Sequence, residues 1–249
     1  MSERRRRTGV KVEGGRAVYG ASVGILMLEA RFPRVHGDMG HAATFPFPVQ
    51  YRVVPGASPD RVVRQGADGL LNAFLDAAQE LVRHGVDGIT TNCGFLSLFQ
   101  AELADAVGLP VAASSLMQVR AVNALLPPGK RAGILTISGS TLTERHLHAA
   151  NVPVDTPVES TEGGAEFTRA ILGDALSLDL ELAREDNVAA AQRLCRDHPD
   201  VGAIVLECTN MTPYAQAIRA ATGVPVFSMV SFLTWFQSGL RPPAYPEGI

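Results

Sequence analysis

The chain has 249 residues, of which 46% are hydrophobic and 19% charged, and its formal net charge is −3 at pH 7. This composition suits a globular core, and the slight negative charge argues against a general nucleic-acid binder. Three cysteines without paired spacing do not indicate a disulfide framework, and no apolar run reaches the ~18 residues that cross a membrane. We therefore expect a cytoplasmic protein that binds neither nucleic acid nor a membrane.

The chain begins with a basic segment, in which Arg4 to Arg7 follow one another. A charge run of this kind is usually solvated, and it lacks the apolar stretch of a signal peptide. We expect residues 1–17 to be a disordered basic tail, whose arginines could also bind an anion.

A buried strand and a long loop come next. Residues 21–28, ASVGILML, are a continuous apolar run, which is typical of parallel sheets. The loop over residues 29–49 is rich in proline and glycine, and loops of this length within a domain are usually functional. Arg31 and Arg34 in this loop could bind a substrate carboxylate, because a guanidinium group pairs with it in a bidentate way.

Residues 50–54 are predicted to form the second strand, and one helix is expected from there to about residue 84. Ser58 or Asp60 would cap this helix, and apolar residues recur at helical spacing over residues 70–81.

The strongest signal in the sequence is an internal repeat. Residues 86–114 align without a gap with residues 201–229, so that Cys93 falls on Cys208 at an offset of 115 residues. Each copy has an apolar run, a cysteine, a helical pattern, Gly-x-Pro and a second apolar run. This order predicts a βαβ unit, present twice, with one thiol at the same joint of each copy.

The segments between and after the copies complete the pattern. Helices are expected over residues 115–126, 143–150, 164–172 and 177–197, a strand over residues 131–136, and an amphipathic helix at the end of the chain. Strands that alternate with helices predict an α/β fold with mostly parallel sheets. The repeat divides it into two pseudo-symmetric lobes, residues 18–115 plus 228–249 and residues 116–227, with the active site between them.

The two repeated cysteines, Cys93 and Cys208, are the predicted catalytic residues. Ligands bind at the carboxyl ends of the strands in such sheets, where the N-terminus of the next helix stabilises an anion. This position should lower the pKa of each thiol toward neutrality. Two thiols on opposite sides of a small molecule could move a proton from one face of a carbon to the other. Cys195 has no counterpart in the first copy and is expected to be structural.

Polar residues around the thiols form the predicted substrate site. The hydroxyl, amide and backbone N–H groups that could bind a small acid belong to Asn92, Gly94, Phe95, Thr136, Ser138, Ser140, Thr209, Asn210 and the loop residue Arg31. Helix capping is an alternative role for the hydroxyls and amides. Glu207 should alternate to the opposite side of its strand and act as a structural acceptor.

At this point the chain resembles the aspartate/glutamate/hydantoin racemase superfamily. Residues 206–213, LECTNMTP, are similar to the family motif LGCTHYP, and residues 133–140, GILTISGS, resemble a family strand that ends in a polar turn. The resemblance implies two α/β lobes with one cysteine each and no cofactor. It departs from glutamate racemases in the Glu29-Ala-Arg-Phe segment, in the Gly-Phe after Cys93, and in Asn210 at the position of a histidine.

The predicted function is therefore a cofactor-independent racemase or epimerase of a small amino acid or related carboxylate. Three alternatives stay open: a relative of maleate isomerase or arylmalonate decarboxylase that acts on a dicarboxylate, a non-catalytic protein that binds a small acid, and a metal enzyme. A metal would use His36, Asp38 and His41, although the prediction is no metal site. A homo-oligomer is possible.

Overall fold

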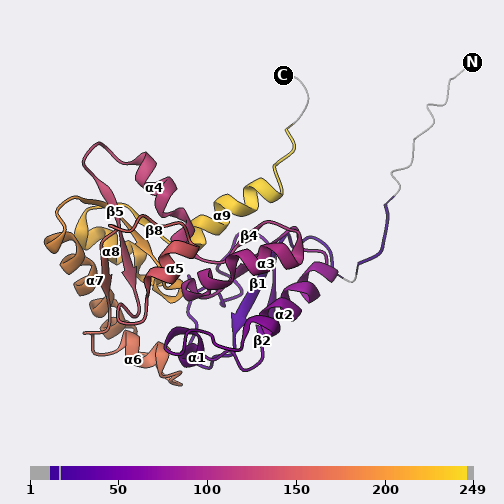
Figure 1. The fold of residues 1–249 in the computed structure, drawn as a ribbon, viewed down its shortest axis with the longest axis horizontal. Helices are drawn as coiled ribbons and strands as arrows, with labels where there is room; N and C mark the ends of the chain where they lie inside the picture. The colour runs from indigo at the N-terminus through magenta and orange to yellow at the C-terminus, as the bar shows by residue number, and fades with distance from the viewer. Residues whose placement is uncertain (1–11, 17, 246–249) are drawn as a thin grey trace, which may run out of the picture.

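The computed structural model describes residues 12–16 and 18–245, which form two lobes side by side (Figure 1). The expected disordered tail covers residues 1–17, and most of it, residues 1–11 and 17, lies outside the described part. Within that part, no helix is both long and apolar enough to cross a membrane.

The first lobe is built on a parallel sheet with the strand order β2-β1-β3-β4. Its strands are β1 (Val23–Leu28), β2 (Val49–Val54), β3 (Gly88–Thr91) and β4 (Val111–Ala112). Every residue of the central strand β1 is buried, as the continuous apolar run predicts.

The second lobe repeats this arrangement with the strand order β6-β5-β7-β8, again all parallel. Its strands are β5 (Arg131–Thr136), β6 (Val158–Ser160), β7 (Val201–Leu206) and β8 (Val226–Phe227). The same order in both sheets confirms the predicted α/β fold with two pseudo-symmetric lobes.

Helices flank both sheets (Figure 1). The α-helices are α1 (Pro59–Val63), α2 (Leu71–Arg83), α3 (Gln100–Val107), α4 (Val119–Leu125), α5 (Glu144–Ala149), α6 (Phe167–Leu172), α7 (Leu180–Asp197), α8 (Ala215–Thr222) and α9 (Met229–Leu240). Three 3-10 helices precede α3, α4 and α8, namely η1 (Gly94–Phe99), η2 (Ser115–Gln118) and η3 (Thr209–Tyr214).

The prediction of a single helix up to residue 84 is wrong, because two helices form there. Ser58 caps α1 by accepting the N–H of Arg61, as expected, but α1 ends at Val63. Gly66, Ala67 and Gly69 then adopt positive φ angles of 66°, 58° and 71°, which no α-helix contains. The chain restarts as α2 at Leu71.

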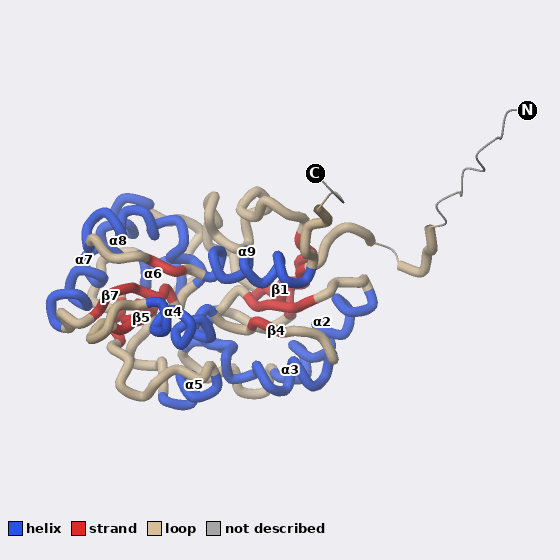
Figure 2. Tube along the Cα trace, turned by 90° about the horizontal axis from the view of Figure 1, so that it is seen from above, coloured by secondary structure: helices blue, strands red, loops and turns tan. Residues whose placement is uncertain are grey.

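One hydrophobic cluster runs through both lobes and includes Leu26 and Phe74 of the first and Leu135 and Leu206 of the second. The last helix, α9, packs against the first sheet through Met229 and Leu233 and lies beside β1 (Figure 2). The chain therefore returns to the first lobe at its end, and the two lobes share a continuous core.

Candidate active site

Cys93 and Cys208 occupy matching positions in the two lobes. Cys93 follows β3 and precedes η1, while Cys208 follows β7 and precedes η3, and both residues have extended backbone angles. Both are buried, with 9% and 6% of their surface exposed. The predicted location of the thiols, at the strand ends and before helical segments, is thus found in both lobes.

The two cysteines line the same cavity between the lobes, which has a volume of about 20 Å³. Its walls are largely apolar, and besides the two cysteines and Gly94 they contain three polar residues, Asn92, Glu207 and Asn210. Residues of the first lobe in the wall are Leu28, Phe32, Pro59, Val63, Asn92, Cys93, Gly94 and Phe95, and those of the second are Ile137, Ile171, Leu172, Glu207, Cys208 and Asn210.

The sulfur atoms have different hydrogen-bond surroundings. The backbone N–H groups of Phe95 and Leu96 point at the Cys93 sulfur and favour its thiolate. The Cys208 thiol lies 3.6 Å from Asn210 Oδ1, to which it donates, and only the N–H of Asn210 points back at the sulfur. Cys93 is therefore the better prepared of the two to carry a negative charge.

The expectation that these thiols have lowered pKa values is wrong. Burial raises the pKa of both thiols, and the negative charge of Glu207 raises them further. The backbone N–H groups and, for Cys93, the nearby Arg34 act in the opposite direction without overcoming burial. The thiols are thus protonated at neutral pH.

Glu207 lies in the cavity wall beside both thiols, and not on the opposite side of the strand. Strand β7 ends at Leu206, so the alternation of side chains along the strand no longer applies at the next residue. Thr136 Oγ1 donates to Glu207 Oε2 at 2.8 Å. Burial raises the pKa of the carboxyl group to about 7.

A polar chain links the long loop of the first lobe to Cys208. Arg34 forms an ion pair with Asp38 at 2.8 Å, and Asp38 accepts a hydrogen bond from the amide of Asn210. Arg34 also stacks on the ring of Phe32, 4.6 Å from its centre. Arg34 Nη2 is buried and has no hydrogen-bond partner among the described residues.

Some predicted substrate-binding residues meet at the cavity. These residues are Asn92, Gly94, Phe95 and Asn210. Thr209 donates to the carbonyl of Asn92 and joins the two cysteine loops. Thr136 reaches the cavity only through Glu207.

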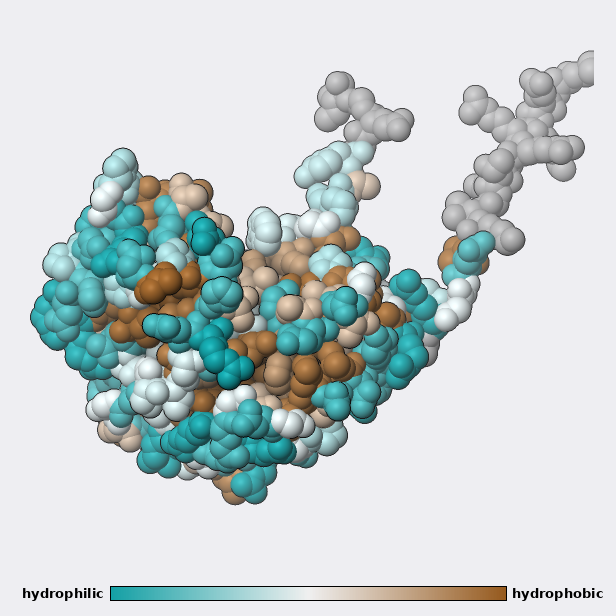
Figure 3. All heavy atoms as spheres, in the orientation of Figure 1, coloured by the Kyte–Doolittle hydropathy of each residue, from teal (hydrophilic) through white to brown (hydrophobic). Residues whose placement is uncertain are grey.

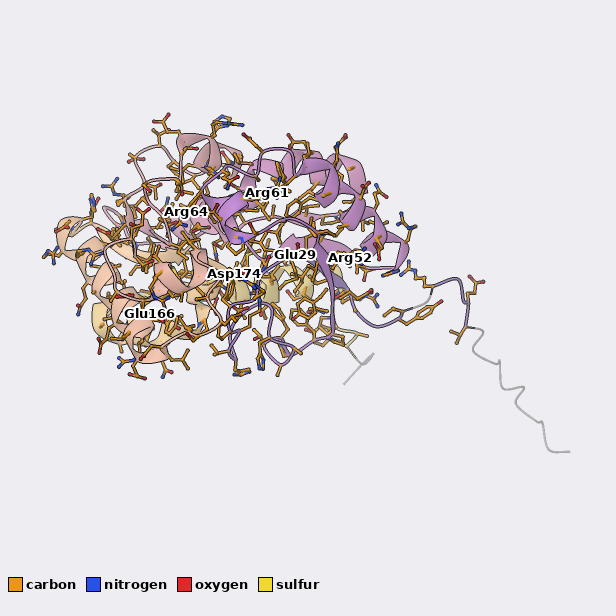
Figure 4. All side chains as sticks on the ribbon, turned by 90° about the horizontal axis from the view of Figure 1, so that it is seen from below. Glu29, Arg52, Arg61, Arg64, Glu166 and Asp174 are labelled. Carbon is orange, nitrogen blue, oxygen red and sulfur yellow. The ribbon has the colours of Figure 1, made fainter. Side chains whose placement is uncertain are left out.

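The remaining predicted residues lie outside the cavity wall. Ser138 and Ser140 both donate to the carboxylate of Glu162. The Arg31 side chain is 72% exposed and pairs with Asp174 of the other lobe at 3.1 Å. Asp174 itself lies between the lobes (Figure 4). The substrate-binding role of Ser138, Ser140 and Arg31 stays a prediction that this geometry does not favour.

The metal alternative has no support in the described part of the chain, since no three His, Cys, Asp or Glu side chains come together there as metal ligands. Asp38 is engaged by Arg34 and Asn210, and the rings of His36 and His41 pack edge to face, 5.6 Å apart. Cys195 lies outside the cavity wall, half-buried on α7.

The fold and site define a two-lobed α/β protein with one cysteine from each lobe in a shared cavity. The family model for Asp/Glu/hydantoin racemase matches residues 58–236, and the chain belongs to this family.

Curated relatives of the chain are named for a lyase activity and not for racemisation. The chain is 30% identical to a dimethylsulfoniopropionate lyase of Durusdinium sp. clade D over 231 residues, which cover 88% of this chain and 75% of that protein. It is 32% identical over 223 residues to dimethylsulfoniopropionate lyase 6 of Emiliania huxleyi, with 84% of this chain and 57% of that protein covered.

Solved structures with the same fold include arylmalonate decarboxylase, with a TM-score of 0.59 and 19% identity over 90% of this chain and 93% of that one. A glutamate racemase isoform from Bacillus anthracis has a TM-score of 0.55 and 16% identity over 88% of this chain and 82% of that one. At these identities the structural likeness shows the fold alone.

Proposed function

We propose that this protein is a cofactor-independent lyase that releases dimethyl sulfide from dimethylsulfoniopropionate. The observation that carries the proposal is the 30% identity to the Durusdinium lyase over 88% of this chain. The shared cavity with two thiols supplies a base for the reaction. The racemase fold supports the same chemistry, because racemisation and this elimination both begin with removal of a proton next to a carboxylate.

The proposed reaction is a β-elimination. A thiolate removes a proton from the carbon next to the substrate carboxylate, and the C–H electrons form the C=C bond of acrylate. The C–S bond breaks, and its electrons leave with dimethyl sulfide, which is neutral. The proton stays on the enzyme thiol and is later lost to water, so that the thiolate is restored.

We assign the base to Cys93 in this proposal. Two backbone N–H groups and Arg34 favour the Cys93 thiolate, whereas Cys208 uses its proton to bind Asn210 and is further disfavoured as an anion by Asp38. A base with an elevated pKa is strong once it is ionised, so a modest thiolate population suffices to remove a weakly acidic carbon-bound proton.

The surroundings of the cavity suit both ends of the substrate. Apolar side chains, Phe32, Ile137 and Leu172 among them, would contact the two S-methyl groups. The unpaired Nη2 of Arg34 is the donor we assign to the carboxylate. A cavity of about 20 Å³ holds about one water molecule, so the lobes must separate to admit the substrate.

The test of this proposal is the release of dimethyl sulfide, measured by headspace gas chromatography on the purified protein with dimethylsulfoniopropionate. We expect equal amounts of dimethyl sulfide and acrylate. In D₂O, acrylate formed by this route carries no deuterium unless proton removal is reversible. No release above the uncatalysed rate would contradict the proposal.

A racemase or epimerase of a small carboxylate is the second candidate, and the presence of both thiols in one cavity favours it. Racemisation needs a thiol on each face of the carbon, whereas elimination needs one base. Incorporation of deuterium from D₂O into a panel of amino and dicarboxylic acids separates the two. Exchange with inversion and without release of a leaving group would support the racemase.

A further inference from the structure

Glu207 is a buried carboxylate that the reaction described above does not use. None of its surface is exposed, and it lines the cavity together with Cys93 and Cys208. Oε2 accepts the hydroxyl of Thr136, but Oε1 has no hydrogen-bond partner in the described part of the protein. A buried carboxylate oxygen without a donor is costly, so it calls for an explanation.

The neighbouring loop makes room for this oxygen. A Cβ atom on Gly94 would lie 2.6 Å from the Glu207 carbonyl oxygen and 2.9 Å from its carboxyl carbon, and closer still to Oε1. Glycine at this position therefore lets the carboxylate lie directly against the Cys93 loop. The free oxygen is thus held at the point where the two lobes meet, next to the proposed base.

The chemical surroundings of Oε1 suit a particular kind of cation. An ammonium group would need several hydrogen-bond acceptors, whereas the walls of this cavity are mostly apolar. A sulfonium ion bears its charge on an atom without N–H or O–H bonds and is surrounded by carbon. It can pair with a carboxylate by charge alone and still pack its methyl groups against apolar side chains.

We propose that Glu207 binds the positively charged leaving group of the substrate and selects it over an uncharged group of the same shape. This inference rests on the proposed lyase function, since it assigns the sulfonium end of that substrate to the second lobe. The carboxylate end would then face Arg34 in the first lobe.

The same placement connects substrate binding to the acidity of the thiols. The charge of Glu207 raises the pKa of both Cys93 and Cys208. A cation that pairs with Glu207 offsets this charge, so the thiolate of Cys93 becomes easier to form when the substrate is present. The substrate would thereby help to ionise its own base.

The experiment compares two unreactive ligands of the same shape, 3-(trimethylammonio)propionate and 4,4-dimethylpentanoate, which differ in one positive charge. Titration calorimetry at pH 8 gives the affinity of each for the wild type, Glu207→Gln and Glu181→Gln. We expect the wild type to prefer the cationic ligand roughly ten- to hundredfold, and Glu207→Gln to lose at least tenfold of this preference. Glu181→Gln, the same change on an exposed part of α7, should keep it.

A second measurement needs no variant and covers the case in which Glu207→Gln does not fold. With a pKa of about 7, Glu207 ionises between pH 6 and 8, so the preference of the wild type for the cationic ligand should increase over this range. The other titratable groups around the cavity are the two thiols and the Arg34–Asp38 pair. Both ligands carry the same carboxylate, so the effects of these groups on its binding cancel in the ratio of the two affinities.

The outcomes separate this inference from the proposed function. Equal preference in the wild type and Glu207→Gln, a preference for the neutral ligand, or binding of neither ligand would overturn the role of Glu207. If the wild type releases dimethyl sulfide and any of these results is found, the lyase function is supported and the role of Glu207 is wrong. If the preference depends on Glu207 but no dimethyl sulfide is released, the cation site is supported and the lyase function is contradicted.

Discussion

At the scale of single residues, Gly94 determines how closely the Cys93 loop and Glu207 approach. We expect Gly94→Ala to lower the free energy of unfolding by about 1–3 kcal/mol, because a methyl group there overlaps Glu207. Dimethyl sulfide release should fall with it, since the carboxylate must move. Gly163→Ala is the control, as a Cβ at Gly163 meets no atom within 4 Å. Urea unfolding of both variants measures the difference, and equal midpoints would contradict the packing argument.

The two thiols should respond differently to substitution in an elimination. Cys93→Ser should reduce dimethyl sulfide release by roughly a thousandfold or more, because a serine hydroxyl is far less acidic than a thiol and almost never supplies the ionised base. Cys208→Ser should retain a larger share of activity, since its hydroxyl can still donate to Asn210. Cys195→Ser should match the wild type.

Steady-state assays of the three variants test the assignment of the base. If Cys208→Ser is the inactive variant and Cys93→Ser is not, the roles of the two thiols are reversed. Equal and complete loss of dimethyl sulfide release in both would show that the elimination needs both thiols and that Cys93 alone is not sufficient as the base.

The contributions of two buried groups to the pH dependence of the free energy of unfolding should cancel. The pKa of Glu207 is raised to about 7, so its folded-state preference for a proton stabilises the protein at low pH and is lost as the pH rises toward 7. Burial lowers the pKa of His146 to about 4, so its contribution is present above its unfolded pKa of ~6.5 and is lost as the pH falls toward 4. Each effect is on the order of 3 kcal/mol, with opposite sign.

Urea unfolding between pH 4.5 and 6.5 checks this cancellation. In the wild type, these two groups together should cause little change in the free energy of unfolding over this pH range. In Glu207→Gln the free energy of unfolding should rise with pH, and in His146→Gln it should fall. A flat profile in His146→Gln would show that the fold does not hold the Glu207 carboxyl group protonated, and a flat profile in Glu207→Gln would show the same for neutral His146.

At the scale of secondary structure, the repeat predicts most of what is found. The segments η1 and α3 have the same bounds as η3 and α8 at an offset of 115 residues, and both units end at a left-handed glycine, Gly108 and Gly223, with φ angles of 62° and 74°. Local sequence determines these features, because caps and turns depend on neighbouring residues. The sequence does not predict the break between α1 and α2, because apolar spacing alone does not reveal the positive φ angle of Ala67.

The segment after α6 contacts the loop after β1 and holds the lobes together. Asp174 accepts the N–H of Phe32 at 3.1 Å and pairs with Arg31. Its φ angle of 49° is left-handed, a conformation that asparagine also tolerates, so Asp174→Asn removes the charge without forcing the backbone to change. We expect faster amide hydrogen exchange around Arg31 and Phe32 in this variant, measured by mass spectrometry.

The control for this experiment is Asp155→Asn, which removes an exposed carboxylate that pairs with Arg131 within the second lobe. It should leave exchange in the first lobe unchanged. Unchanged exchange in Asp174→Asn would mean that the hydrophobic core alone keeps the lobes closed.

At the scale of the whole molecule, the sequence predicts the two lobes and the meeting of Cys93 with Cys208, because both follow from the duplicated unit. It does not predict which other side chains reach the cavity. Arg34 and Glu207 lie there because of how one lobe packs on the other, a property of contacts that are remote in sequence. The sequence likewise does not predict the apolar surface over α9, where Trp235 is 68% exposed (Figure 3).

The small size of the cavity has a kinetic consequence. The proposed substrate has eight non-hydrogen atoms and does not fit in about 20 Å³, so we expect the lobes to separate before it binds. The continuous core across the lobes should keep the population of this open, binding-competent conformer small, because opening exposes apolar surface. The apparent dissociation constant is then the intrinsic one divided by that population, and variants that loosen the lobes should bind more tightly even where they turn over more slowly.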